Sequence, residues 1–172
     1  MSVLAVLSAA CVNSNPPRPQ GQRSIMVPMH AISVEGMGAS IGQIEIDEED
    51  GALVLRPALS GLPSGAHGIH VHQNPNCGPG LKDGQPTAGQ AAGEHFDPAV
   101  TGRHAGPTGG GHAGDLPRLM VDSDGTARMG LISTRLRLAD VRGRSIIIHA
   151  ADDNYADQPG GARIACGVVP GA

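Results

Sequence analysis

Aromatic side chains and long apolar runs are scarce in this chain. Its 172 residues include one Phe, one Tyr and no Trp, so a core has to be built from small aliphatic side chains. Ile, Val, Leu and Phe together number 36, about a fifth of the chain, which is just above the level of disordered sequence. No apolar run reaches the ~20 residues that span a bilayer. Helical bundles and membrane-spanning proteins are therefore poor matches, and the length fits one domain.

Lysine is equally rare. Lys82 stands beside 11 arginines, and these basic side chains are scattered rather than clustered. With 16 acidic residues the net charge is −4. Phosphate binding needs a concentrated cationic face, so we expect no nucleic acid partner. The eight histidines are more informative, because six of them lie between His67 and His112.

Residues 1–23 are predicted to lie outside the fold. An apolar stretch ends at Cys11, and a polar, Pro-rich segment follows at 13–20. This arrangement is similar to the end of a bacterial lipoprotein signal, in which the Cys is lipid-modified, although no basic residue precedes the apolar stretch. The alternative is a cleaved signal with an incidental Cys11. We expect a periplasmic or cell-envelope protein with its folded domain at 24–172, whose membrane contact is through an N-terminal lipid anchor only.

Two further cysteines, Cys77 and Cys166, are widely separated in a loop-rich chain. Their spacing suits a disulfide in an oxidising compartment, and two buried free thiols suit it equally well. A disulfide closing so long a loop would stabilise the fold by roughly 4 kcal/mol in the chain-entropy model.

Eight segments are predicted to be β-strands, because turn residues bound their aliphatic and β-branched side chains there. They are 24–34, 41–47, 52–59, 67–73, 116–122, 126–132, 145–150 and 162–169. Asp50-Gly51 and Asp124-Gly125 are typical of hairpin turns, and no helix of normal length is predicted. The pattern favours an all-β fold, an eight-stranded antiparallel Greek-key barrel or sandwich.

Two long loops interrupt the strand pattern. Residues 74–115 contain 5 Pro and 11 Gly with almost no aliphatic pattern, and residues 151–161 are also polar. A structureless connection of such length is uncommon unless it is functional. We therefore expect the two loops to form the functional site and the strands to position it.

Histidines alternate with aliphatic residues at 69–72. Side chains two apart on a strand share a face, so His70 and His72 are expected to project together while Ile69 and Val71 enter the core. His149, at the end of another predicted strand, would add a third imidazole to this metal chelate. The alternative is the solvated surface of an ordinary strand.

Four more metal donors lie in the first long loop. They are His95, His104, His112 and Asp115. Three nitrogens and one carboxylate oxygen make a full tetrahedral set for zinc. The alternative is a hydrophilic loop with incidental histidines, but a loop this poor in apolar residues needs another constraint to become ordered, and a metal ion would provide it.

Five short motifs follow one another in a specific order. They are GAHGIHVH at 65–72, AGEHFDP at 92–98, GHAGDLP at 111–117, IIHA at 147–150 and GARIACGV at 161–168. In sequence and order they resemble the copper–zinc superoxide dismutases in their bacterial periplasmic form, and the resemblance runs from about residue 27 to residue 169.

The resemblance implies one copper and one zinc ion per subunit. Copper would be held by His70, His72, His95 and His149, and zinc by His95, His104, His112 and Asp115, with His95 shared. Asp153 would link the outer nitrogens of a copper and a zinc ligand. His67 would be structural, bonded to the backbone, and Cys77 and Cys166 would form the disulfide of the family.

The resemblance also implies an oxidoreductase that dismutates superoxide to dioxygen and hydrogen peroxide, acting as a monomer or homodimer. Copper would be reduced and reoxidised in turn. His95 and Arg163 would be catalytic, His95 by taking a proton when it leaves reduced copper and Arg163 by hydrogen-bonding the superoxide anion. Lys82 is a candidate for longer-range steering, with a solvated loop lysine as the alternative. Glu94 departs from the Gly that is common beside the bridging histidine, and it adds negative charge near the site.

Two other functions compete with this one. A non-catalytic copper/zinc-binding or copper-delivery domain would typically lack copper ligands or the arginine, and here both are present. Copper acquisition by residues 26–30 is the second, since their thioethers and imidazole suit Cu(I), but an ordinary first strand explains the same residues.

Overall fold

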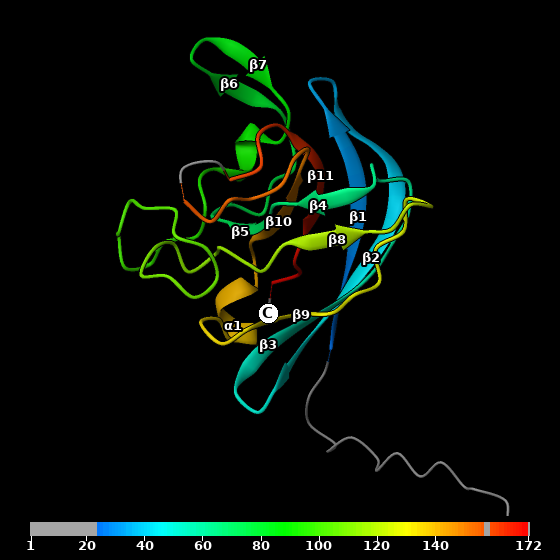
Figure 1. The fold of residues 1–172 in the computed structure, drawn as a ribbon. Helices are drawn as coiled ribbons and strands as arrows, with labels where there is room; N and C mark the ends of the chain where they lie inside the picture. Colours follow the sequence, from blue (N-terminus) through cyan, green and yellow to red (C-terminus); the bar gives the residue numbers. More distant parts are fainter. Residues whose placement is uncertain (1–23, 157–158, 172) are drawn as a thin grey trace, which may run out of the picture.

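The computed structural model describes residues 24–156 and 159–171, and these are almost entirely β-strand and loop (Figure 1). The strands are β1 (Ile25–Ser33), β2 (Gly36–Glu49), β3 (Ala52–Leu59), β4 (Gly65–His67), β5 (Ile69–His72), β6 (Gly80–Lys82), β7 (Gln85–Thr87), β8 (Leu119–Val121), β9 (Leu131–Ser133), β10 (Ser145–His149) and β11 (Arg163–Val168). The helical elements in these ranges are a 3₁₀ turn at Gln90–Ala92 and the four-residue α1 (Leu138–Val141). No described helix is long and apolar enough to cross a bilayer.

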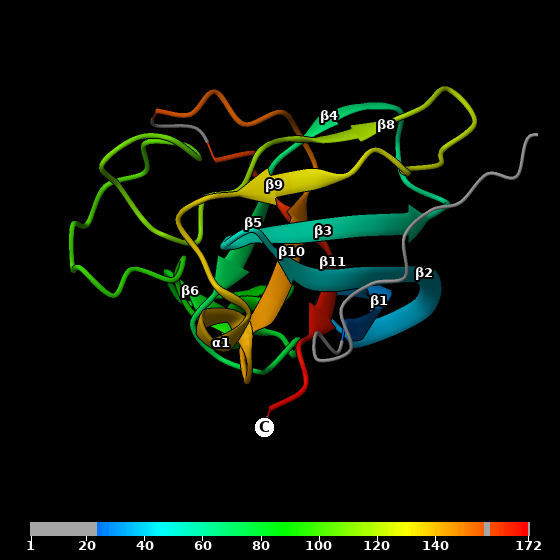
Figure 2. The ribbon, with the colours of Figure 1, turned by 90° about the horizontal axis from the view of Figure 1, so that it is seen from below.

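Seven strands form one antiparallel sheet in the order β5-β10-β11-β1-β2-β3-β9. The sheet curls on itself (Figure 2). The β4–β8 pair lies near both of its edges, because β4 leads directly into the edge strand β5, and the chain after β8 returns to pair Ala127 with Leu59 of β3. This curled antiparallel arrangement confirms the predicted all-β barrel.

The barrel interior is aliphatic, as the composition required. In β1, Ile25, Val27 and Met29 are buried, and the side chains between them are exposed, which is the alternation of a strand with one face on the core. Met29 is fully buried in the main core cluster, and His30 Nδ1 lies 3.2 Å from Gly38 O. Residues 26–30 therefore lie in a regular first strand, as the alternative interpretation expected.

Four strand predictions were wrong in detail. The strand expected at 41–47 is longer, because β2 runs from Gly36 to Glu49. The segment 67–73 is divided into β4 and β5 at Gly68, where a Cβ would lie 2.6 Å from the oxygen of Pro159, so the second long loop passes against the backbone there. The strand expected at 126–132 is reduced to the Ala127 bridge and β9, because the exposed residues 128–130 leave the ladder. The predicted strand 116–122 forms its ladder only over β8.

The loop 74–115 is not structureless, which is a further correction. It contains the hairpin β6–β7 and the 3₁₀ turn. The hairpin projects from the barrel (Figure 1) and most of its side chains are exposed, so it lacks the buried face that produces hydrophobic alternation. Its Asp83-Gly84 turn, with both φ values positive, is the one sequence signal that marked it.

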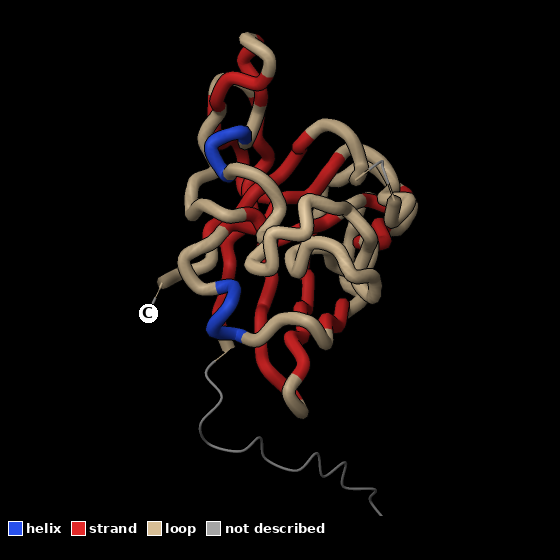
Figure 3. Tube along the Cα trace, turned by 90° about the vertical axis from the view of Figure 1, so that its left-hand side faces the viewer, coloured by secondary structure: helices blue, strands red, loops and turns tan. Residues whose placement is uncertain are grey.

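The two long loops gather on one side of the barrel. Figure 3 views the molecule from that side, where loops and turns cover the strands. The disulfide between Cys77 and Cys166, with Cα atoms 5.7 Å apart, ties the first loop to β11. It confirms the pairing and excludes the free thiols.

Candidate metal centre

Adjacent strands bring the first three histidines together. β10 pairs with β5, with Ile147 opposite His70 and Ser145 opposite His72, and His149 ends β10. His95 joins them because the loop makes a bridge between His72 and His95. Ile69 and Val71 point into the core, while His70 and His72 face the site, as the alternation predicted.

These four histidines form a compact nitrogen cluster. One nitrogen from each of His70, His72, His95 and His149 lies within 4.8 Å of the others. The His70 and His95 rings stack with centroids 4.1 Å apart, and the His70 and His149 centroids are 4.8 Å apart. All four residues are buried.

The ring nitrogens that face away from this cluster are hydrogen-bonded. His72 Nδ1 donates to Gly93 O and His149 Nδ1 donates to Gly161 O, both at 2.9 Å, while His70 Nε2 lies 2.8 Å from Asp153. The opposite nitrogens, His70 Nδ1, His72 Nε2 and His149 Nε2, are buried without a hydrogen-bond partner. Buried polar atoms normally have one, and a metal ion would satisfy these three together.

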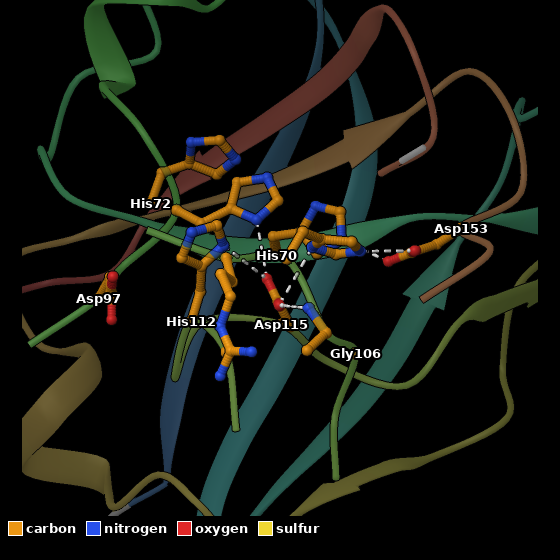
Figure 4. Close-up of polar contacts among 12 residues, drawn as sticks. His70, His72, Asp97, Gly106, His112, Asp115 and Asp153 are labelled. Carbon is orange, nitrogen blue, oxygen red and sulfur yellow. Dashed lines mark hydrogen bonds and ion pairs between the residues drawn. The ribbon is translucent and has the colours of Figure 1, made fainter. Parts of the chain in front are cut away.

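The loop donors converge on Asp115. Its carboxylate oxygens lie 2.8 Å from His95 Nδ1, 3.0 Å from His104 Nδ1 and 3.5 Å from His112 Nδ1 (Figure 4). Nδ1 of His112 is buried and makes no hydrogen bond. A second compact donor group is made of His70, His95, His104 and Asp115, so His112 stands at its edge. Asp115 therefore lies near all three loop histidines, with His112 the most distant of them.

Asp153 joins the two groups. Its Oδ2 accepts a hydrogen bond from His70 Nε2 at 2.8 Å, and its Oδ1 accepts one from His104 Nε2 at 2.7 Å. Tyr155 N–H donates to the same Oδ1 at 2.7 Å. The carboxylate is fully buried, so it fixes the orientation of one ring of each group.

Burial sets the charge of the nitrogen cluster. Loss of solvent lowers the pKa of His70 to about 4 and that of His149 to about 3, and it also lowers the pKa of His72 and His95. These imidazoles are therefore neutral near pH 7 in the metal-free protein. Neutral imidazole is the form that binds metal.

Among the loop donors, the carboxylates of Asp115 and Asp153 have the opposite effect and raise the pKa of a histidine. Burial by itself would lower the pKa of His104, but hydrogen bonds to Asp115 and Asp153 outweigh it and raise this pKa to about 9. Burial would raise the pKa of both carboxyls, and the hydrogen bonds from His104 and its neighbours instead hold them well below their usual range. Both acids are therefore ionised and available to a cation.

Arg163 is held beside the nitrogen cluster by the first loop. Its Nη1 donates to Gly89 O at 2.7 Å and its Nη2 donates to Gly93 O at 2.9 Å. Gly93 O is also the acceptor for His72 Nδ1. Arg163 and Lys82, the two basic residues singled out from the sequence, line the same cavity of about 320 Å³. A second cavity, of about 500 Å³, is lined by Glu94, His95 and other loop residues.

His67 stays outside both groups. Its two ring nitrogens lie 2.7 Å from His149 O and 2.8 Å from Pro63 O. It therefore braces the backbone at the end of β10, in the structural role expected for it.

Sequence reasoning missed two arginines that support the loops. Arg144 places its guanidinium carbon 3.6 Å from the centroid of the Phe96 ring, next to His95, and Arg135 donates to main-chain oxygens of the first loop. Both are isolated in the sequence and far from the loop that they contact, and no local pattern marks such long-range partners.

An all-nitrogen site suits copper, and three nitrogens with a carboxylate suit zinc. The fold and the site therefore define a β-barrel metalloprotein with two adjoining metal positions. Residues 40–169 match the family model described as copper/zinc superoxide dismutase (SODC). The chain belongs to the copper–zinc superoxide dismutase family.

Individual relatives agree with the family model. The chain is 46% identical over 149 residues to Superoxide dismutase [Cu-Zn] 2 of Salmonella typhimurium, covering 83% of this chain and 86% of the relative. The Cu/Zn superoxide dismutase from Brucella abortus superposes with a TM-score of 0.83 at 42% identity, over 86% of this chain and 99% of that one. The solution structure of the monomeric copper, zinc superoxide dismutase from Salmonella enterica gives a TM-score of 0.77 at 46% identity, with the same two coverages.

Proposed function

We propose that the nitrogen cluster and the loop donors around Asp115 are the metal sites of this enzyme. Copper would be held by His70, His72, His95 and His149, and zinc by His95, His104, His112 and Asp115. His95 would serve both ions, because its Nδ1 lies 2.8 Å from Asp115 and its ring stacks on that of His70 with centroids 4.1 Å apart.

One observation carries this assignment. Four buried histidine nitrogens have no hydrogen-bond partner, namely His70 Nδ1, His72 Nε2, His149 Nε2 and His112 Nδ1. Leaving so many buried polar atoms unsatisfied would be costly. The first three face the nitrogen cluster and the fourth lies beside the Asp115 carboxylate, so two ions would satisfy all four.

The protein is an oxidoreductase that converts two superoxide anions and two protons into dioxygen and hydrogen peroxide. Copper, when bound, supplies the one-electron reduction and oxidation, and zinc has no redox chemistry. His95 Nε2 is the atom proposed to hold a proton in the reduced half of the cycle. Asp115 and Asp153 keep the surrounding rings in fixed tautomers while that proton moves.

Arg163 is proposed to bind and orient the substrate anion. Two of its nitrogens are fixed by the carbonyls of Gly89 and Gly93, so the guanidinium is held in one place beside the copper ligands. The net charge of −4 repels an anion, and the association rate then depends on the local field. Lys82, in the same cavity as Arg163, is proposed to steer superoxide from a longer distance.

A non-catalytic metal-binding or copper-delivery domain is not favoured. Such a module needs no guanidinium anchored beside an open cavity, and this chain has one in Arg163. The family and the anchored guanidinium of Arg163 both indicate an enzyme.

We also propose a periplasmic or envelope location, with residues 24–172 as the enzymatic domain. The Cys77–Cys166 disulfide supports an oxidising compartment. The proposed lipid modification of Cys11 and the tether at 1–23 lie outside the described residues, and mass spectrometry of the mature protein tests them.

Elemental analysis together with a superoxide-consumption assay on the purified chain tests the assignment. We expect one copper and one zinc per chain and rapid superoxide consumption. H72A is expected to lose copper while keeping zinc, and H112A to lose zinc while keeping copper. Metal contents unchanged by both substitutions would contradict it.

A further inference from the structure

Arg135 lies outside both long loops, in the segment between β9 and α1, and its guanidinium reaches into the first of them. Nη1 donates to His112 O at 2.9 Å and to Gly106 O at 3.4 Å, and Nη2 donates to Gly111 O at 2.5 Å. Three main-chain oxygens from one loop therefore converge on a single half-buried cation.

Within the described residues, the loop's own main chain offers these oxygens one hydrogen bond, a long one of 3.4 Å from Asp115 N–H to His112 O. His112 N–H donates to Arg103 O at 2.9 Å, which turns the chain back on itself. A Cβ at Gly111 would lie 2.3 Å from Arg103 O, so the close approach requires glycine. Gly106 and Gly111 are buried, and a buried carbonyl needs a donor. Arg135 is that donor.

Among the described residues, no carboxylate pairs with the guanidinium to explain its position otherwise. Among residues 24–156 and 159–171, the arginine–carboxylate pairs belong to Arg56 and Arg118. The side-chain hydrogen bonds of Arg135 in the same ranges go to the loop carbonyls. Its interactions are thus with the backbone that carries the loop histidines.

We propose that Arg135 is a positioning residue for zinc, acting through the main chain of residues 106–112. This rests on the zinc ligands proposed above. His112 Nδ1 is the donor farthest from the Asp115 carboxylate, at 3.5 Å against 2.8 Å for His95. The position of His112 Nδ1 relative to Asp115 therefore depends most on how firmly the main chain of His112 is held. Arg135 donates a hydrogen bond directly to the carbonyl of that residue.

Zinc release from the fully metallated protein tests the proposal. The rate is followed with a chromogenic chelator for the parent, R135M, R135K and H112A, with copper retention and circular dichroism recorded in parallel. R142M is the matched control, because Arg142 donates to the single carbonyl of Gly171 near the C-terminal end of the chain. Cobalt(II) placed at the zinc position reports ligand geometry through its visible absorption, which a loss of general stability would leave unchanged.

We expect R135M to release zinc at least tenfold faster than the parent, the size of effect seen when a partner that orients metal ligands is removed. Its copper retention should be unchanged and its cobalt spectrum altered. R135K, with one nitrogen for three carbonyls, should lie between R135M and the parent, and R142M should match the parent.

Parent-like zinc release and cobalt absorption in folded R135M, with fast release in H112A, would overturn the role of Arg135 alone. Should R135M not fold, R135K decides the question, and parent-like release there has the same meaning. Parent-like release in H112A would instead overturn the ligand assignment, and the role of Arg135 with it.

Discussion

The carboxylate of Asp153 lies 2.7 Å from Nε2 of His104, a residue 49 positions earlier in the chain. The other oxygen of the same carboxylate accepts a hydrogen bond from His70 Nε2 at 2.8 Å. One buried side chain from the second loop therefore orients a proposed ligand of each metal. Because Asp153 belongs to the second loop and His104 to the first, the two loops meet at this carboxylate.

Replacing Asp153 should loosen zinc first. In D153N an amide presents N–H donors toward at least one of the two imidazole N–H groups, so His104 or His70 loses its acceptor. We expect zinc affinity to fall about 10- to 100-fold, measured by competition with a chelator. D152N is the control, since Asp152 is half exposed and pairs with Arg118. Equal zinc affinity in D153N and D152N would contradict the role of Asp153.

Reversing the charge of Arg163 should slow the reaction without loss of copper or zinc. R163E places a carboxylate where superoxide must approach, and local fields of this kind change association rates by about 10- to 1,000-fold. We expect superoxide consumption to fall by at least tenfold while copper and zinc contents stay at the parent level. R163K should retain part of the rate. An unaltered rate in R163E would remove Arg163 from the mechanism.

Neutralising Glu94 should speed the reaction. Glu94 is exposed, adjoins His95 in sequence, and lines the cavity that His95 reaches. Its negative charge opposes anion entry, so E94Q should raise kcat/KM about twofold at low ionic strength. The gain should disappear at high salt, where charges are screened. D122N, in an exposed turn after β8, removes the same charge elsewhere, and an equal gain there would mean that only net charge matters.

Reducing the disulfide should release metal before the strands unfold. Cys77 and Cys166 close a loop with a sequence separation of 89, worth about 4 to 5 kcal/mol in the chain-entropy model. The bond also ties the loop that holds Arg163 and His72 through Gly93, and loops open more easily than core strands. Metal release and far-ultraviolet circular dichroism, followed together in a titration with reductant, should separate into two steps. Simultaneous loss of both signals would argue against this order.

Local sequence patterns predicted the strands that have one buried face. The alternation in β1 and the aliphatic run of β10 can be recognised in the sequence, because burial of one face or both faces of a strand imposes a hydrophobic pattern. The β6–β7 hairpin has no such face and was missed. The break at Gly68 was also missed, because its cause is a distant segment at Pro159.

The residues of the candidate site could be predicted from the sequence to a similar extent. The two histidines of β5 share a face by strand geometry alone, and the loop histidines are conspicuous in a segment with little else to order it. Which nitrogen each ring turns inward could not be predicted. That choice is made by the acceptors Gly93 O, Gly161 O and Asp153, which come from other parts of the chain.

The amino-acid order alone determined that this chain forms small-aliphatic antiparallel strands and carries enough histidine for two metal ions, since periodicity and donor count are properties of neighbouring residues. The tertiary structure alone decided that the carbonyls of Gly93 and Gly161 would orient the rings of His72 and His149 and that Arg135 would reach the first loop. Those contacts link segments that are distant in the chain, and such contacts form only when the barrel closes.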